Sequence, residues 1–199
     1  MGLLKTLFTN CAHPKGRMGR AMLRFMNLCH ATLTNWGLSL VEIKDGWTML
    51  DIGCGGGATL RRLLKRSNGG MVYGIDISEE SVAKARKVNA DVLDKQVFVA
   101  QGSAEKLPYE DWKFDLVTAV ETVYFWPNLP DCLQEVRRVL KPGGKFAIMV
   151  EVALQQQGLL CQSLLRVSSN STVNYAGSDE GYSGDIRTKE SSSLWDEEW

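Results

Sequence analysis

Short apolar runs alternate with segments of helical periodicity through the middle of the chain. The runs occupy residues 48–52, 71–76, 97–100, 114–120 and 145–152. Between the first two runs, the apolar residues Leu60, Leu63 and Leu64 fall on one helical face. A continuous apolar run is typical of a parallel strand that is buried on both faces. The alternation predicts an α/β fold, a Rossmann-like, mostly parallel, twisted sheet with helices on both faces.

Local signals also predict where two of the later helices begin and end. Ser78 followed by two glutamates indicates a capped helix start, and this helix is expected to run to about Ala90. A second helix is expected to start at Leu129 and Pro130 and to end at the turn 141–144.

The first 45 residues predict a helical cap ahead of the core. From Met18, apolar residues recur at helical spacing up to Leu33, with arginines largely on the opposite face. We therefore divide the chain into a cap (1–45), a core (46–154) and a C-terminal tail (155–199). A chain of 199 residues with 44% hydrophobic content suits one well-buried domain.

Charge and cysteine content exclude several function classes. Lys+Arg and Asp+Glu balance at 23 each, so bulk charge gives no reason to expect a nucleic-acid partner. The five cysteines are scattered and only two histidines are present, which supports neither a disulfide framework nor a metal site. No apolar run reaches the roughly 18 residues that span a bilayer, so we expect no membrane partner and a cytoplasmic location.

The stretch from Thr48 to Ala58 carries the chemistry. A strand ends in Asp51, a glycine turn follows, and the turn opens a helix. Glycines let a ligand approach the backbone, and free N–H groups at a helix start attract polar ligand atoms, so we expect a nucleotide-like cofactor. The spacing of the glycines also allows NAD as the cofactor, with Asp76 as the ribose-binding acid. Asp51 would repel a pyrophosphate and favour a cationic sulfonium, which favours S-adenosylmethionine.

Five segments, in the expected order, resemble those of class I S-adenosylmethionine-dependent methyltransferases. They are residues 50–57, 73–78, 102–108, 114–117 and 140–144. Together with the N-terminal region, they resemble the small bacterial methyltransferase-domain proteins related to the ubiquinone/menaquinone-biosynthesis type. The resemblance implies S-adenosyl-L-methionine as cofactor and methyl transfer to a small-molecule acceptor by direct in-line displacement.

The resemblance also implies a set of cofactor-binding residues. Asp76 is assigned to the ribose hydroxyls and Ile77 to one adenine face, and Ser103 stands where many relatives carry aspartate for the adenine amino group. The full predicted set is Asp51, Gly53, Cys54, Gly55, Gly57, Asp76, Ile77, Ser103, Ala104 and Glu121.

Three residues are the candidates for proton transfer, if the acceptor needs deprotonation: Glu121, Tyr124 and His30. Glu121 is the first choice because it follows the fourth strand, next to the glycine turn. The aromatic residues 124–126 favour a planar or lipophilic acceptor. Two alternatives stay open: a non-catalytic or degenerate paralogue that binds the same cofactor, and an NAD-dependent oxidoreductase.

The tail departs from the family pattern, which adds a helix and a hairpin to give strand order 3-2-1-4-5-7-6. We expect that hairpin to be atypical or missing, with residues 159–167 as the helix and 181–188 as a faint sixth strand. Without a hairpin, the fifth strand would expose an apolar edge and favour a homodimer. Alternatively, the tail is disordered, which its composition permits.

Overall fold

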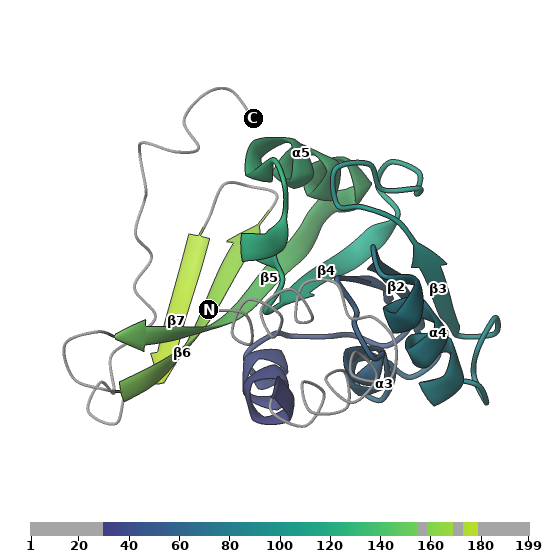
Figure 1. Cartoon of the computed structure of the whole chain (residues 1–199), viewed down its shortest axis with the longest axis horizontal. Helices are drawn as coiled ribbons and strands as arrows, with labels where there is room; N and C mark the ends of the chain where they lie inside the picture. Colours follow the sequence, from purple (N-terminus) through teal and green to yellow (C-terminus); the bar gives the residue numbers. More distant parts are fainter. Residues whose placement is uncertain (1–29, 155–158, 169–172, 179–199) are drawn as a thin grey trace, which may run out of the picture.

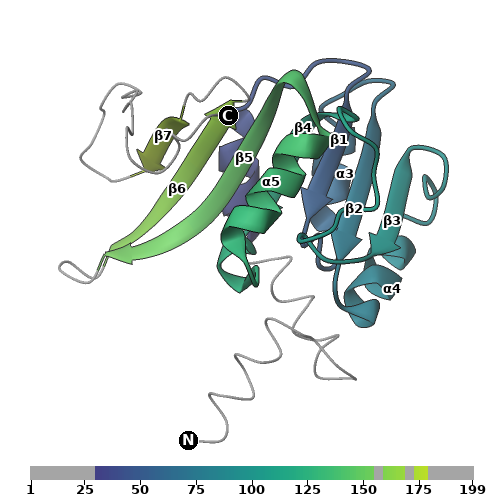
Figure 2. The same cartoon turned by 90° about the horizontal axis from the view of Figure 1, so that it is seen from above.

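A single twisted sheet of seven strands organises the protein (Figures 1 and 2). The computed structural model describes residues 30–154, 159–168 and 173–178, and side chains within residues 30–150. The strand order is β3-β2-β1-β4-β5-β6-β7. The strands are β1 (Thr48–Ile52), β2 (Met71–Asp76), β3 (Val97–Gln101), β4 (Phe114–Val120), β5 (Leu140–Leu154), β6 (Leu159–Ser168) and β7 (Val173–Ser178).

The first five strands pair in parallel, which confirms the predicted Rossmann-like sheet. Helices α3 (Ala58–Leu64) and α4 (Glu79–Val88) cover one face, and α5 (Leu129–Val139) covers the other (Figure 1). Ser78 caps α4 by accepting a hydrogen bond from the Ser81 N–H, as its position predicted. The carboxyl ends of the five strands therefore meet at one edge of the sheet.

Two apolar clusters fill the two faces because side chains alternate along β1. Met49 lies in the cluster with Leu60 and Leu63 of α3, whereas Leu50 lies in the cluster with Val136 of α5. Burial on both sides explains why the strands read as unbroken apolar runs. The sheet's interior thus holds the strand ends in fixed positions.

Residues 30–39 are helical and pack on the same face as α3. Leu33 and Leu38 are buried there, and a Cβ added at Gly37 would lie 2.7 Å from the Met149 sulfur in β5. This helix is the described part of the expected N-terminal cap. The rest of that cap, residues 18–29 included, lies outside the described residues.

The C-terminal part of the sheet corrects two expectations. Residues 159–168 form strand β6 instead of the expected helix, and β6 pairs antiparallel with β5 from Lys145 to Leu154. The fifth strand therefore has no open edge over those residues, and the reason for expecting a homodimer is removed. Strand β7 then pairs with β6, so the hairpin is present but atypical, because β6 and not β7 adjoins β5. The expected strand at 181–188 lies outside the described residues.

Strand β5 also starts earlier than expected, at Leu140 instead of Lys145. Leu140 pairs with Phe114, and the register then shifts so that Lys145 pairs with Leu116. Residues 141–144 lie opposite the single residue Asp115 in this irregularity. The expected turn thus becomes a bulge within the strand.

The carboxylate of Asp51 is buried in the middle of the sheet. It is 1% exposed and accepts a hydrogen bond of 2.7 Å from the Thr118 hydroxyl on β4. Burial raises the pKa of Asp51 to about 7; the Thr118 bond opposes this effect and the charge of Asp76 adds to it. The folded protein therefore holds this proton more tightly than the unfolded chain.

We expect Gly57→Ala to destabilise the fold by roughly 2–5 kcal/mol. Gly57 has a φ of 78°, and an added Cβ would lie 2.7 Å from the Ala85 backbone in α4. Gly69→Ala is the matched control, because Gly69 has a φ of 70° but open space around it. That variant should lose only about 1–2 kcal/mol, for the backbone strain alone. Equal losses in urea denaturation would show that contact with α4 does not matter.

We expect Asp51→Asn to alter how stability depends on pH. An acid whose pKa is raised on folding makes the free energy of unfolding fall as pH rises from its ordinary pKa, about 4, to its folded pKa. For Asp51 the folded pKa is about 7. Asparagine keeps an acceptor for Thr118 and carries no charge, so the variant should not lose stability in this way. The free energy of unfolding of the variant minus that of wild type should therefore increase by roughly 2–4 kcal/mol from pH 4 to pH 8.

Urea denaturation at pH 4, 6 and 8 measures this difference. Asp94→Asn, which removes an acid from an exposed ion pair with Arg86, is the control and should change stability by less than about 1 kcal/mol at each pH. Parallel curves for wild type and Asp51→Asn would contradict the expectation.

Candidate cofactor and acceptor site

The glycine turn, residues 53–57, is tied to the end of the neighbouring strand β2. The N–H groups of Gly53 and Cys54 both donate to the Ile75 carbonyl, at 2.8 and 3.0 Å. The Gly55 N–H donates to Asp76 Oδ2 at 2.8 Å. Three consecutive residues of the turn thus bond to two consecutive residues of β2, which fixes the turn at the sheet edge.

The carboxylate of Asp76 is held by backbone on both oxygens. Oδ2 accepts from Gly55, and Oδ1 accepts from the Ser78 N–H at 2.9 Å. Two N–H donors orient the carboxylate. The capped start of α4 and the glycine turn therefore position one acid between them.

A cavity of about 260 Å³ opens at this edge of the sheet. Its walls come from the helix 30–39, the glycine turn, α3, the end of β2, the loop after β3 and the segment after β4. The predicted site residues that line it are His30, Gly53, Cys54, Gly55, Asp76, Ile77, Ser103, Ala104 and Glu121. Tertiary structure thus gathers into one cavity predicted residues that are up to 91 positions apart in sequence, from His30 to Glu121.

Three predicted residues do not line the cavity. Asp51 lies behind the lining, bonded to Thr118. Gly57 faces Ala85 and Asn89 of the α4 segment, so it serves packing. Tyr124 is 57% exposed and reaches the site through Glu121, whose Oε2 accepts its hydroxyl at 2.6 Å.

The position of Asp51 changes the electrostatic argument drawn from the sequence. With a pKa of about 7, this buried carboxyl is partly protonated at neutral pH. Its charge is therefore weaker there than an exposed aspartate would carry. The oriented carboxylate that lines the cavity is Asp76, which two backbone N–H groups hold.

Cys54 contributes backbone to the site, while its thiol belongs to the core. The residue is 4% exposed and lies in the apolar cluster beneath α3, where a Cβ at Gly74 would be 3.0 Å from its sulfur. Burial raises the pKa of the thiol well above its ordinary value. A nucleophilic role for this cysteine is thereby excluded at neutral pH.

Glu121 occupies an unusual backbone conformation directly after β4. Its φ is 56°, and its N–H donates to the Met149 carbonyl of β5 at 2.9 Å. Left-handed backbone at a non-glycine residue costs roughly 1–3 kcal/mol and is typical of functional positions. The bond to β5 and the bond from Tyr124 hold Glu121 in place.

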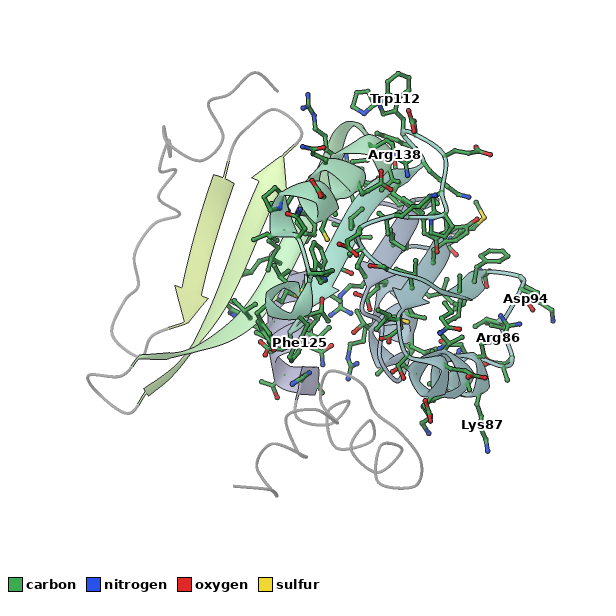
Figure 3. The ribbon with its side chains drawn as sticks, turned by 45° about the horizontal axis from the view of Figure 1, so that its top comes forward. Arg86, Lys87, Asp94, Trp112, Phe125 and Arg138 are labelled. Carbon is green, nitrogen blue, oxygen red and sulfur yellow. The ribbon has the colours of Figure 1, made fainter. Side chains whose placement is uncertain are left out.

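Aromatic and apolar side chains surround the part of the cavity next to Glu121. Phe125 and Trp126 line it, and the rings of Tyr124 and Phe125 are 4.6 Å apart. Figure 3 shows Phe125 at the opposite end of the sheet from Trp112 and Arg138. Ile77, 52% exposed, adds an apolar surface at the end of β2. The cavity therefore combines an oriented acid with apolar walls.

Several lining residues were not identified from the sequence. Thr34 follows His30 by one helical turn, and Thr59 and Arg62 share the face of α3 that begins at Ala58. Only their helical spacing relative to predicted residues could have indicated them. Gly56, Phe125 and Trp126 belong to the glycine turn and to the aromatic segment 124–126, but they were not among the predicted site residues.

The cavity carries groups that could hold the adenosyl part of S-adenosylmethionine. A Cβ at Gly55 would meet nothing within 4 Å, so the backbone there is open to a ligand. Asp76 offers carboxylate oxygens for vicinal hydroxyls, and Ile77 offers an apolar surface for a flat base.

Comparisons with known proteins agree with this geometry. The model of the family described as a methyltransferase domain matches residues 50–148. The 27-O-demethylrifamycin SV methyltransferase of Amycolatopsis mediterranei is 39% identical over 118 residues, 58% of this chain and 43% of that protein. A sterol 24-C-methyltransferase of Gibberella zeae is 40% identical over 110 residues, 54% of this chain and 28% of that protein.

Solved structures show the same fold. The crystal structure of a SAM-dependent methyltransferase from Aquifex aeolicus aligns with a TM-score of 0.62 at 26% identity, over 69% of this chain and 75% of that chain. The chain spans less than half the length of the two curated relatives above. Among the described residues, no helix has the length and apolar character to cross a membrane. By its matched domain and its fold, the chain carries a methyltransferase domain over residues 50–148, with the fold of the class I S-adenosylmethionine-dependent methyltransferases.

Proposed function

We propose that this chain binds S-adenosyl-L-methionine and catalyses methyl transfer to a small-molecule acceptor by direct in-line displacement. The observation that carries the proposal is the junction of the glycine turn with Asp76, through the 2.8 Å bond from the Gly55 N–H. That junction lines the same cavity as Glu121 and the aromatic residues that follow β4. Residues 46–154 form the catalytic core of this proposal, and residues 1–45 its cap.

The donor's adenosyl part binds at the β2 side of the cavity. Asp76 accepts hydrogen bonds from the ribose hydroxyls, and Ile77 packs on one face of the adenine. Ser103 and the Ala104 N–H contact the adenine edge from the loop after β3. Gly53 and Gly55 bring backbone close to the amino-acid end. The residues named here all line the cavity, which supports this assignment.

The acceptor binds beside Glu121, where the cavity wall is aromatic. The bound donor supplies an electrophilic methyl carbon on a sulfonium, so the protein needs only to align the acceptor and exclude water. When the acceptor must lose a proton, the Glu121 carboxylate takes it, and Tyr124 orients that carboxylate. His30, across the cavity lining, is the further candidate base.

The class of acceptor that suits these walls is a lipophilic or planar small molecule. Phe125, Trp126 and the Tyr124 ring offer apolar and aromatic surface. The relatives named above are a methyltransferase for a demethylrifamycin and one for a sterol. A protein that binds the donor without catalysis is the second candidate, and the assays below separate the two.

The first test is calorimetric titration with S-adenosylhomocysteine and, separately, with NAD⁺. We expect the wild-type protein to bind S-adenosylhomocysteine and to show no comparable heat with NAD⁺. Asp76→Asn should weaken binding about 10- to 100-fold, because it removes the charged acceptor for the ribose. Asp91→Asn, an exposed acid paired with Arg61 away from the cavity, is the control and should leave affinity unchanged. Tight NAD⁺ binding without S-adenosylhomocysteine binding would refute the proposal.

The second test screens lipophilic acceptors with methyl-labelled donor and then compares variants on an acceptor that is methylated. For an acceptor hydroxyl, Glu121→Gln should lower kcat by about 100-fold or more at saturating donor. Tyr124→Phe should lower it less, because the carboxylate stays and loses only its orienting bond. Glu110→Gln, an exposed acid outside the cavity, is the control. Unchanged kcat in Glu121→Gln would exclude Glu121 as the base.

A further inference from the structure

Arg62 places a positive charge in the cavity wall on the α3 side. Arg62 lies one helical turn after Ala58 and Thr59 on α3, and all three line the cavity. His30 and Thr34, also one turn apart, line it from the helix 30–39. This group of five residues, the α3 wall, faces the cavity from the sheet face that α3 covers.

The α3 wall has two parts: α3 follows the glycine turn directly and packs on β1 and β2, whereas the helix 30–39 lies farther from the predicted adenine site. The helix 30–39 packs on β5, as the close approach of Gly37 to Met149 shows. In the sheet order, β4 and β5 lie on one side of β1, whereas β2 and β3 lie on the other. Ile77 and Ser103 follow β2 and β3. A ligand with one end at Ile77 and Ser103 that crosses the turn past Asp76 therefore has its other end between α3 and the helix 30–39.

The charge of Arg62 has no ion-pair partner among the described side chains. Neighbouring Arg61 pairs with Asp91, and Arg86 pairs with Asp94, but no salt bridge involves Arg62 within residues 30–150. Partial burial and the nearby Arg66 lower the pKa of Arg62, which shows that its charge is poorly stabilised. A guanidinium nevertheless stays protonated in proteins.

The nearest acid does not compensate this charge in the cavity. Asp51 interacts with Arg62 electrostatically, but its carboxyl is fully buried behind the lining and bonded to Thr118. A partly desolvated cation that lines a cavity is stabilised by an anion inside that cavity. A ligand group with negative charge would therefore stabilise Arg62 in the α3 wall.

We propose that Arg62 binds the carboxylate at the amino-acid end of the methyl donor and makes the site selective for donors that carry it. The inference rests on the proposed function, because it takes the ribose to lie at Asp76. From there the donor extends past its sulfur across the glycine turn, toward the α3 wall. Guanidinium and carboxylate pair through two parallel hydrogen bonds, which gives selectivity as well as affinity. Thr34 and Thr59 add hydroxyls beside the same carboxylate.

The test compares two probes by calorimetry: S-adenosylhomocysteine and its decarboxylated counterpart, which keeps the amine. Wild type should prefer the carboxylated probe by at least about 10-fold. Arg62→Gln should lose most of that preference while it keeps its affinity for the decarboxylated probe within about 2-fold. Arg62→Lys should retain part of the preference, because lysine supplies charge without the paired hydrogen bonds.

Arg61→Gln is the matched control, since Arg61 lies on the same helix and pairs with Asp91 outside the cavity. It should bind both probes as wild type does. If wild type binds neither probe, the proposed function fails and not only the role of Arg62. If wild type binds both probes equally, or if Arg62→Gln weakens both equally, the inference is overturned. Should Arg62→Gln not fold, the wild-type preference and the intermediate preference of Arg62→Lys decide the question.

Discussion

The structure depends on the attachment of the glycine turn to the end of β2. The Gly53, Cys54 and Gly55 N–H groups all donate to Ile75 or Asp76, so backbone that would otherwise be exposed becomes part of the sheet edge. The bond from the Gly55 N–H also orients the Asp76 carboxylate. Because parallel strands present their carboxyl ends together, this one attachment sets where a ligand can bind.

Packing beneath the turn explains why its glycines have different roles. Gly55 has open space where a Cβ would lie, whereas Gly57 is in contact with Ala85 and Asn89. The first position lets a ligand approach, and the second lets α4 approach. A motif that reads as four similar glycines in sequence is therefore divided between binding and packing.

Burial, more than amino-acid composition, determines which charged side chains face the cavity. Asp51 is bonded to Thr118 inside the sheet, and burial raises its pKa to about 7. Asp76 stays at the surface of the cavity with two backbone donors. Arg62 completes the arrangement from α3. A donor with a ribose, a sulfonium and a carboxylate matches this order of groups, which is the physical basis of both proposals.

The sequence by itself determined the alternation of strands and helices, the glycine turn and the acid at the end of β2. These are local features, encoded by apolar runs, by capping residues such as Ser78 and by backbone that only glycine adopts easily. Tertiary structure alone decided which side chains reach the cavity. Burial removed Asp51 from the lining, contact with α4 removed Gly57, and helix packing brought Arg62 and Thr34 in. It also decided that residues 159–168 pair with β5 as a strand, since the hydrogen bonds of that strand come from distant residues and not from its own periodicity.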